Sequence, residues 1–440
     1  MFQTLRNAWK ITDLRKKIFF TLFIILIFRI GSAVSVPYVD IETLRQATAS
    51  NTGGLMDYIT LLSGGGFSNA SIFALSITPY INASIIIQLL TVAIPPLERM
   101  AKDGEAGRKK LGQITRYTTV GLGLMLGVAY YFMVRNNYNA LVSQAKTGGW
   151  AWFAAIVIIL CFTAGSALMM WLGEQINEKG IGNGISILLF AGIISRIPQA
   201  SAYLWKIFYD GGIKLVGQDS AAVKNIILVP VVLVIFIAII AFIVFMTNAE
   251  RRIPVQYAKR VVGRKMYGGQ NTYIPIKVNM SGVMPIILAS AIVSLPAILA
   301  GFFSWKGWFW NLFKSTHPVY LILMFVFIIG FAFFYVTIQY NPTEMANNLR
   351  KNSGAIPGYR PGKPTTDFIK RVLSKITLIG AVFLGFIAVF PGVFGLLAGS
   401  QFAGLSLGGT SVMIVVGVAL ETTQQLESQM MMRHYKGFLE

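Results

Sequence analysis

Polar side chains interrupt one of the most apolar stretches of this chain, and their chemistry is hydrogen bonding where lipid offers no partner. Residues 71–88 read SIFALSITPYINASIIIQ, so Pro79, Asn82, Ser84 and Gln88 stand among branched aliphatic side chains. Proline removes a backbone donor, and the bilayer core cannot satisfy amides or hydroxyls. A helix with this composition is expected to face protein or water rather than lipid.

The residues just before this stretch predict a short element that does not cross the membrane. Residues 56–62 are too few to span, and Gly64, Gly65 and Gly66 follow them. A short helix that enters the membrane and returns would fit beside the broken helix. The alternative is a proline kink preceded by a flexible outer loop.

Side chains suited to covalent catalysis or metal binding are scarce. The single cysteine, Cys161, lies in an apolar stretch, which excludes intrachain disulfides and a cysteine-based metal site. Neither His317 nor His434 lies in an apolar stretch, and the sequence has no His-Glu-x-x-His motif and no phosphate-binding loop. We therefore expect no enzyme activity, no metal and no cofactor, so that any ATP energy must come from a partner.

Two long polar loops are rich in positively charged side chains. In residues 248–277, Ile253, Val255 and Tyr257 alternate with polar or small neighbours, which predicts a β-hairpin. Residues 341–375 contain the run IPGYRPG, a compact turn that would hold Arg360 at an exposed tip. Basic side chains on protruding loops predict a docking surface for a large acidic partner.

The elements that must position these residues are hydrophobic stretches of membrane-spanning length. A helix needs about 20 apolar residues to cross a bilayer. We identify ten stretches, at roughly 18–36, 72–94, 117–134, 150–172, 181–195, 225–247, 283–303, 318–340, 376–398 and 405–420. At 55% hydrophobic and 12% charged residues, the chain is predicted to be an all-α polytopic membrane protein whose first stretch is a retained span, not a cleaved signal peptide.

Lysine and arginine alternate from one side of these stretches to the other. The N-terminus, the C-terminus and every second connection hold 28 of the 38 basic residues, whereas the other side holds 9 and Arg29 lies inside the first stretch. Because cytoplasmic loops carry the excess of Lys and Arg, both termini are predicted to be cytoplasmic. The net charge of +21 is for the most part a consequence of this topology.

Seven motifs, spread from the second span to the last, resemble those of the SecY family, the central subunit of the bacterial protein-conducting channel. They are SIFALSITPYINASIIIQLL, KDGEAGRKK, WLGEQINEKGIGNGIS, RRIPVQYAKR, KVNMSGVMP, IPGYRPG and GGTSVMIVVGV. The resemblance implies ten spans in two inverted five-helix halves, residues 1–205 and 206–440, in a bacterial plasma membrane. It also implies an hourglass channel for unfolded polypeptides.

The resemblance assigns roles to particular residues. A constriction ring would consist of Ile77, Ile81, Ile185, Leu189, Ile287 and Ile414. A plug helix at about 57–70, containing Gly64, Gly65 and Gly66, would rest under that ring. A lateral gate for membrane-protein clients would run past Gln88, Asn279 and Thr115.

The same resemblance implies partners. Arg251, Arg252, Lys259, Arg260 and Arg360 would contact the ribosome or the motor ATPase SecA. Small membrane subunits of the SecE and SecG kind, signal-bearing polypeptides and membrane lipids complete the expected set.

An ion-coupled solute transporter is the main alternative, since it also combines inverted repeats with broken helices. Such a transporter usually carries buried acidic residues or histidines in its path, whereas Glu174 and Glu421 lie at span ends here. Arg29 lies near the outer end of its span, followed by Gly31 and Ser32, and we expect it to serve as a structural anchor.

Overall fold

The computed structural model describes most of the chain. The described residues are 2–50, 63–137, 139–142, 149–199, 201–202, 205, 208–209, 220–257, 260–262, 265–267, 271–302, 308–313, 317–398 and 409–436.

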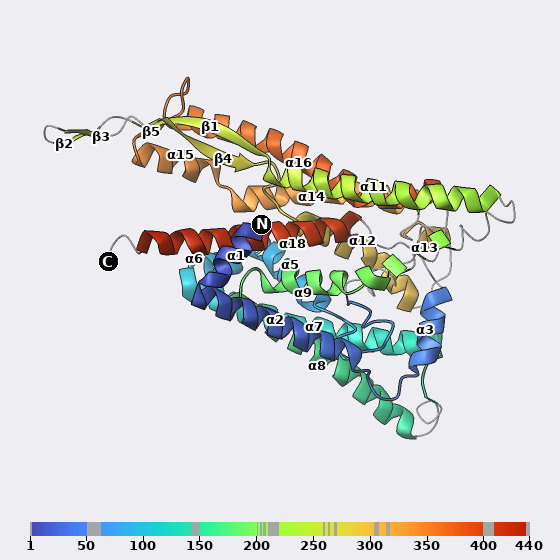
Figure 1. The fold of residues 1–440 in the computed structure, drawn as a ribbon. Coiled ribbons are helices and arrows are strands. Elements are labelled where there is room, and N and C mark those ends of the chain that lie inside the picture. Colours follow the sequence, from blue (N-terminus) through green and yellow to red (C-terminus); the bar gives the residue numbers. More distant parts are fainter. Residues whose placement is uncertain are drawn as a thin grey trace.

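Helices arranged in two outer groups enclose a central set (Figure 1). One outer group consists of α2 (Thr12–Ala33), α7 (Gly104–Phe132) and α8 (Gly149–Lys179), and the other of α11 (Ser220–Asn248), α14 (Pro318–Gln339) and α16 (Lys363–Ala398). Between them lie α5 (Thr78–Ala93), α9 (Gly184–Ile194), α12 (Met284–Phe302) and α18 (Gly409–Lys436). Contacts of α18 with α9, and of α12 with α5 and α7, join the two sequence halves.

Shorter helices complete the helical part. They are α1 (Phe2–Lys10), α3 (Ile41–Ser50), α6 (Pro95–Lys102), α13 (Trp308–Asn311) and α15 (Pro342–Lys351), together with a π-helical turn, η1 (Met133–Asn137).

Several of these helices are long and apolar enough to cross a membrane. Within the described residues, four meet that criterion: Gly104–Asn136, Trp150–Lys179, Pro318–Lys351 and Lys363–Phe390. A fifth candidate is the pair α5 and α6, bent by 102° at Ile94. A helical membrane protein is therefore supported, while the prediction of ten spans remains a prediction.

The second predicted span begins later than the apolar sequence does. Residues 63–77 form a series of turns, and α5 starts only at Thr78, with Ile77 as its N-cap and Pro79 in its first turn. Proline is well tolerated there because the first helical amides have no partner within the helix. Pro79 thus marks a helix start rather than a kink. The part of the predicted plug helix at 63–70 is turns, and 57–62 lie outside the described residues.

The predicted hairpin is present in the first long loop. Strand β1 (Glu250–Tyr257) pairs antiparallel with β4 (Asn271–Lys277), Ile253 opposite Ile274, and β5 (Gly354–Ala355) adds to the far end of β1. A smaller hairpin of β2 (Arg260–Val262) and β3 (Lys265–Tyr267) extends beyond it. The inward alternation is confirmed, since Ile253 and Val255 are buried in a core that also includes residues of α15 and α16.

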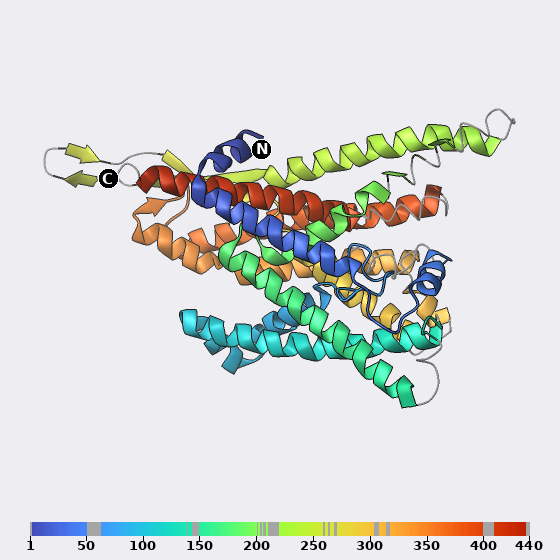
Figure 2. The ribbon, with the colours of Figure 1, turned by 60° about the horizontal axis from the view of Figure 1, so that its bottom comes forward.

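Both basic loops lie at one end of the molecule. In Figures 1 and 2 the strands, α15 and the C-terminus are at the left, and α3 is at the right. The chain enters α2 at the loop end, so α2 points its C-terminal residues, including Arg29, toward the opposite end.

Candidate functional site

The six aliphatic residues predicted to form a ring lie in one hydrophobic cluster. Ile77, Ile81, Leu189 and Ile414 are at most 8% exposed, and partly buried Ile185 and Ile287 pack against the same cluster. They come from the start of α5, from α9, α12 and α18, so both sequence halves contribute. Branched aliphatic side chains converging in this way can exclude water and ions.

Local capping fixes the helices that carry this cluster. The Asn183 side chain accepts hydrogen bonds from the backbone amides of Ile185 and Ser186, 3.1 and 3.5 Å away, which caps α9. The amide of Gly184 donates to Asn177 Oδ1 at 2.8 Å. At the start of α5, the Ile81 amide donates to the Ile77 carbonyl at 3.1 Å, which sets these two side chains one turn apart.

A cavity of about 530 Å³ lies beside the cluster and is lined by polar and apolar residues of both halves. Two of the predicted gate residues, Gln88 and Asn279, line it. The hydroxyl of Tyr335 on α14 donates to Gln88 Oε1 at 2.8 Å, so one hydrogen bond joins the two halves across this cavity. Asn279 is 8% exposed, and its Oδ1 has no hydrogen-bond partner among the described residues.

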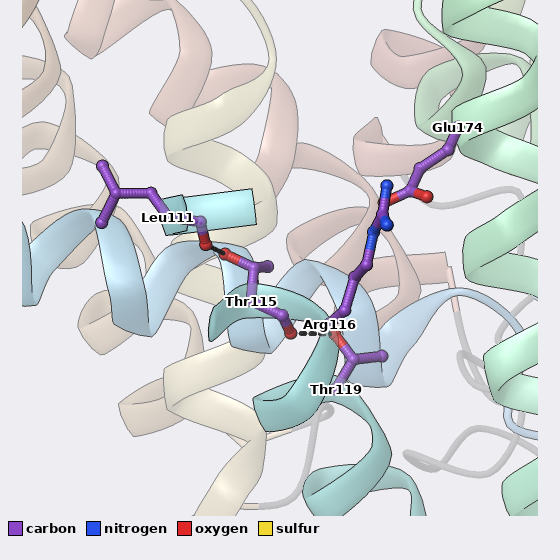
Figure 3. A network of polar contacts seen from close by, with 5 residues as sticks. All are labelled: Leu111, Thr115, Arg116, Thr119 and Glu174. Carbon is purple, nitrogen blue, oxygen red and sulfur yellow. Dashed lines mark hydrogen bonds and ion pairs between the residues drawn. The ribbon is translucent and has the colours of Figure 1, made fainter. Parts of the chain in front are cut away.

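Thr115, the third predicted gate residue, is bonded within its own helix. Its hydroxyl donates to the Leu111 carbonyl at 2.9 Å, and Thr119 donates to the Thr115 carbonyl at 2.7 Å (Figure 3). The next residue, Arg116, forms an ion pair with Glu174 at 2.9 Å that ties α7 to α8. In the described part of the chain, no hydrogen bond links Thr115 to Gln88 or Asn279, although α7 does contact α12.

The basic residues predicted to dock a partner differ in the contacts that they make within this chain. Arg252 pairs with Glu250 at 2.6 Å and lies over the Tyr273 ring, 4.7 Å from its centroid; its hydrogen bond to Glu250 raises the pKa of Arg252. Arg251 and Arg360 are exposed. Lys259 lies outside the described residues, and only the backbone of Arg260, in β2, is described.

The three glycines of the predicted plug lie in the turns at 63–77. Gly64 and Gly65 have φ angles of +62° and +90°. Further along, Phe67 and Ala70 are buried in a second core with Tyr130 and Phe162, so this part of the segment is packed into the protein.

Sequence reasoning missed Tyr335, which supplies a hydrogen bond between the halves at this cavity. The available signal was a tyrosine inside an otherwise apolar span, because a buried phenol hydroxyl needs a partner. Among the described residues, no group of three or more His, Cys, Asp or Glu could hold a metal ion.

Comparison with known proteins identifies the family. The SecY family model matches residues 71–423. The chain is 43% identical to the protein translocase subunit SecY of Streptomyces galbus and 42% identical to that of Bacillus subtilis, over the full length of both chains in each case.

Solved structures agree on the fold. One described as "The structure of a protein conducting channel" has a TM-score of 0.63 at 20% identity, covering 94% of this chain and 92% of that one. Sec61 in a canine ribosome-channel complex has a TM-score of 0.60 at 18% identity, with the same coverage. With a family model covering most of its length and full-length relatives above 40% identity, this chain belongs to the SecY family.

Proposed function

We propose that this chain is the channel subunit of a protein translocase, which passes unfolded secretory polypeptides across a membrane. The observation that carries the proposal is that one hydrophobic cluster contains all six predicted ring residues, drawn from both sequence halves. A narrow aliphatic constriction dewets and so blocks ions, and it offers a passing polypeptide no hydrogen bond. The chain itself is then a conduit and not an enzyme.

The cavity beside the cluster is the proposed lateral gate for transmembrane clients. Gln88 and Asn279 line it, and the Tyr335–Gln88 hydrogen bond holds α14 to α5. Interhelical hydrogen bonds in membranes average about 0.6 kcal/mol, with a maximum near 1.7 kcal/mol. An apolar signal helix gains about 0.3–0.6 kcal/mol per residue on entering lipid, so ten such residues outweigh this bond.

Replacing Tyr335 with phenylalanine is expected to loosen this gate. The loss of about 0.6 kcal/mol corresponds to roughly a threefold shift of the closed–open equilibrium toward the open form. The measurement is the export of precursors with weakened signal sequences, relative to intact ones. The Tyr340→Phe variant is the control, because Tyr340 caps the same helix and does not line the cavity. Equal discrimination by both variants and the unsubstituted protein would contradict the gate role of Tyr335.

The basic loops are the proposed docking surface for the energy source. Exposed Arg251 and Arg360, with Lys259 and Arg260, would meet the ribosome or the motor ATPase SecA, and two structural relatives were solved with a ribosome. These loops and both termini are proposed to be cytoplasmic, in a bacterial plasma membrane. Subunits of the SecE and SecG kind are the proposed membrane partners, and residues around 57–70 are the proposed plug.

Reconstitution into lipid vesicles tests the function directly. Vesicles containing this chain and its small partner subunits are expected to import a signal-bearing precursor when SecA and ATP are supplied. They are expected not to accumulate a labelled small solute. Solute uptake without precursor import would favour the transporter alternative.

A further inference from the structure

We propose that Arg29 is a positioning residue that latches the glycine turn at 63–66, and thereby keeps the idle channel sealed. The latch is the hydrogen bond from its guanidinium to the backbone carbonyl of Gly64. This inference rests on the proposed channel function, and it gives a task to a cation that the channel mechanism otherwise leaves unused.

Groups from two helices converge on Gly64. Arg29 Nη1, on α2, donates to the Gly64 carbonyl oxygen at 3.3 Å. Ser195, the C-cap of α9, has its Oγ 3.5 Å from the same oxygen, but this hydroxyl also donates to the Gly192 carbonyl at 2.6 Å. A hydroxyl has one hydrogen, so Ser195 is committed to Gly192 and Arg29 is the main donor to Gly64.

The turn has more bonds to other elements downstream of the glycines than at Gly64. Downstream of the glycines, the Ala70 carbonyl accepts from the Val36 amide at 2.9 Å, and the Phe67 carbonyl accepts from the Tyr130 hydroxyl at 2.7 Å. Phe67 and Ala70 are also buried. Gly64, in contrast, is tied to other elements through the Arg29 bond and the longer Ser195 contact.

The backbone of Gly65 gives the latched turn its tight shape. Its φ angle of +90° is one that residues with a side chain rarely adopt, and a Cβ built there would meet nothing within 4 Å. Ser63 is fully buried, its carbonyl accepts from the Gly66 amide at 3.1 Å, and its hydroxyl oxygen accepts from the Phe67 amide at 3.0 Å. Residues 63–67 therefore form one compact turn, and release of Gly64 from Arg29 would untie this turn from α2.

The charge and the exposure of Arg29 suit a hydrogen bond to Gly64 that must break during transport. A cation in an apolar span is unfavourable unless it reaches a polar partner or the interface. Arg29 is exposed and lies toward the end of α2, away from the basic loops, so water can compete for its hydrogens. A charge-assisted bond of 3.3 Å at such a place can hold the turn and still be broken during transport.

Ion leak through idle channels tests the latch. The Arg29→Gln variant is expected to raise ion conductance of planar bilayers about tenfold, and Arg29→Lys, which keeps the charge, less than that. Arg135→Gln is the matched control, because exposed Arg135 also makes one bond of 3.3 Å, to the Tyr131 hydroxyl, and none to residues 63–77 among the described contacts. The same leak in the Arg29 and Arg135 variants would overturn the latch.

A reversible cross-link provides a second readout that a merely structural role would not produce. A Cβ built at Gly64 lies 2.9 Å from Ser195 Oγ, so the pair Gly64→Cys and Ser195→Cys is within disulfide reach in a Cys161→Ser background. Oxidation is expected to stop precursor transport and to suppress the leak caused by Arg29→Gln, and a reductant is expected to restore both. Failure of the cross-link to form, or normal transport by the oxidised protein, would overturn the proposal.

Different results would overturn the channel function and the Arg29 latch. An unsubstituted protein that imports no precursor with SecA and ATP overturns the channel function itself. Normal import by the unsubstituted protein, with no extra leak from Arg29→Gln, overturns only the latch.

Discussion

Replacing Gly184 with alanine is expected to open the seal and to destabilise the fold. A Cβ at this position would overlap the backbone carbonyl oxygen of Gly173 on α8 and lie 2.8 Å from its carbon. Backbone atoms cannot move aside as a flexible side chain can, so α9 must shift away from α8. Because α9 carries Ile185 and Leu189, the shift displaces two of the six residues that are proposed to form the ring.

The expected loss is near the upper end of the range of about 1–3 kcal/mol for overpacking a core. Thermal unfolding in detergent measures the stability, and ion conductance in bilayers measures the seal. Gly330→Ala is the matched control, since Gly330 lies within α14 and a Cβ there would meet nothing within 4 Å. Equal midpoints of unfolding for the two variants would show that α8 and α9 are not packed as closely as described.

Local patterns made much of this fold predictable. The alternation of Ile253, Val255 and Tyr257 predicted the hairpin, and the pattern of apolar stretches predicted helices of membrane-spanning length. The exposed turn around Arg360 also followed from local sequence, through the proline and glycine residues on either side of it. Each of these features depends on residues close together in the chain, where spacing alone limits the possible structures.

The start of α5 was harder to predict because packing overrides the apolar pattern there. Residues 72–77 read as part of a span, yet they are turns whose backbone is held by the end of α2, with the Ile72 amide bonded to the Val34 carbonyl at 3.0 Å. Ser76 has a φ angle of +53°, which a helix cannot accommodate. The sequence contains no local signal that Val34 would lie beside Ile72.

Partners of single polar residues were the least predictable part of the site. Gln88 was predicted to be a gate residue, but its bond to Tyr335 joins positions 247 apart in the chain. Arg29 was expected to be an anchor, and its acceptor is a backbone carbonyl on a turn whose position depends on several helices. Such pairs follow from how the helices pack, which one sequence does not specify.

Reversing the charge of Arg360 is expected to abolish motor-driven export while leaving the protein folded in the membrane. Arg360 is exposed at the tip of the second basic loop, and no hydrogen bond or ion pair described for this part of the chain involves its side chain. The Thr365 hydroxyl donates to the Arg360 carbonyl at 2.8 Å, and the Tyr359 and Phe368 rings pack with centroids 4.3 Å apart. Arg360→Glu should therefore preserve the turn and change only the charge that it presents.

An acidic partner surface would then meet an acidic tip, and like charges placed together at an interface cost several kcal/mol, enough to reduce export to background. The measurement is SecA-driven import of a precursor into vesicles, together with binding of SecA at several salt concentrations. Lys370→Glu is the control, because Lys370 is also exposed in this loop but lies on α16, away from the tip. If the interface is centred on Arg360, the Lys370 variant keeps most of its activity. Normal import by Arg360→Glu would remove this residue from the docking surface and leave the hairpin around Arg251 as the main contact.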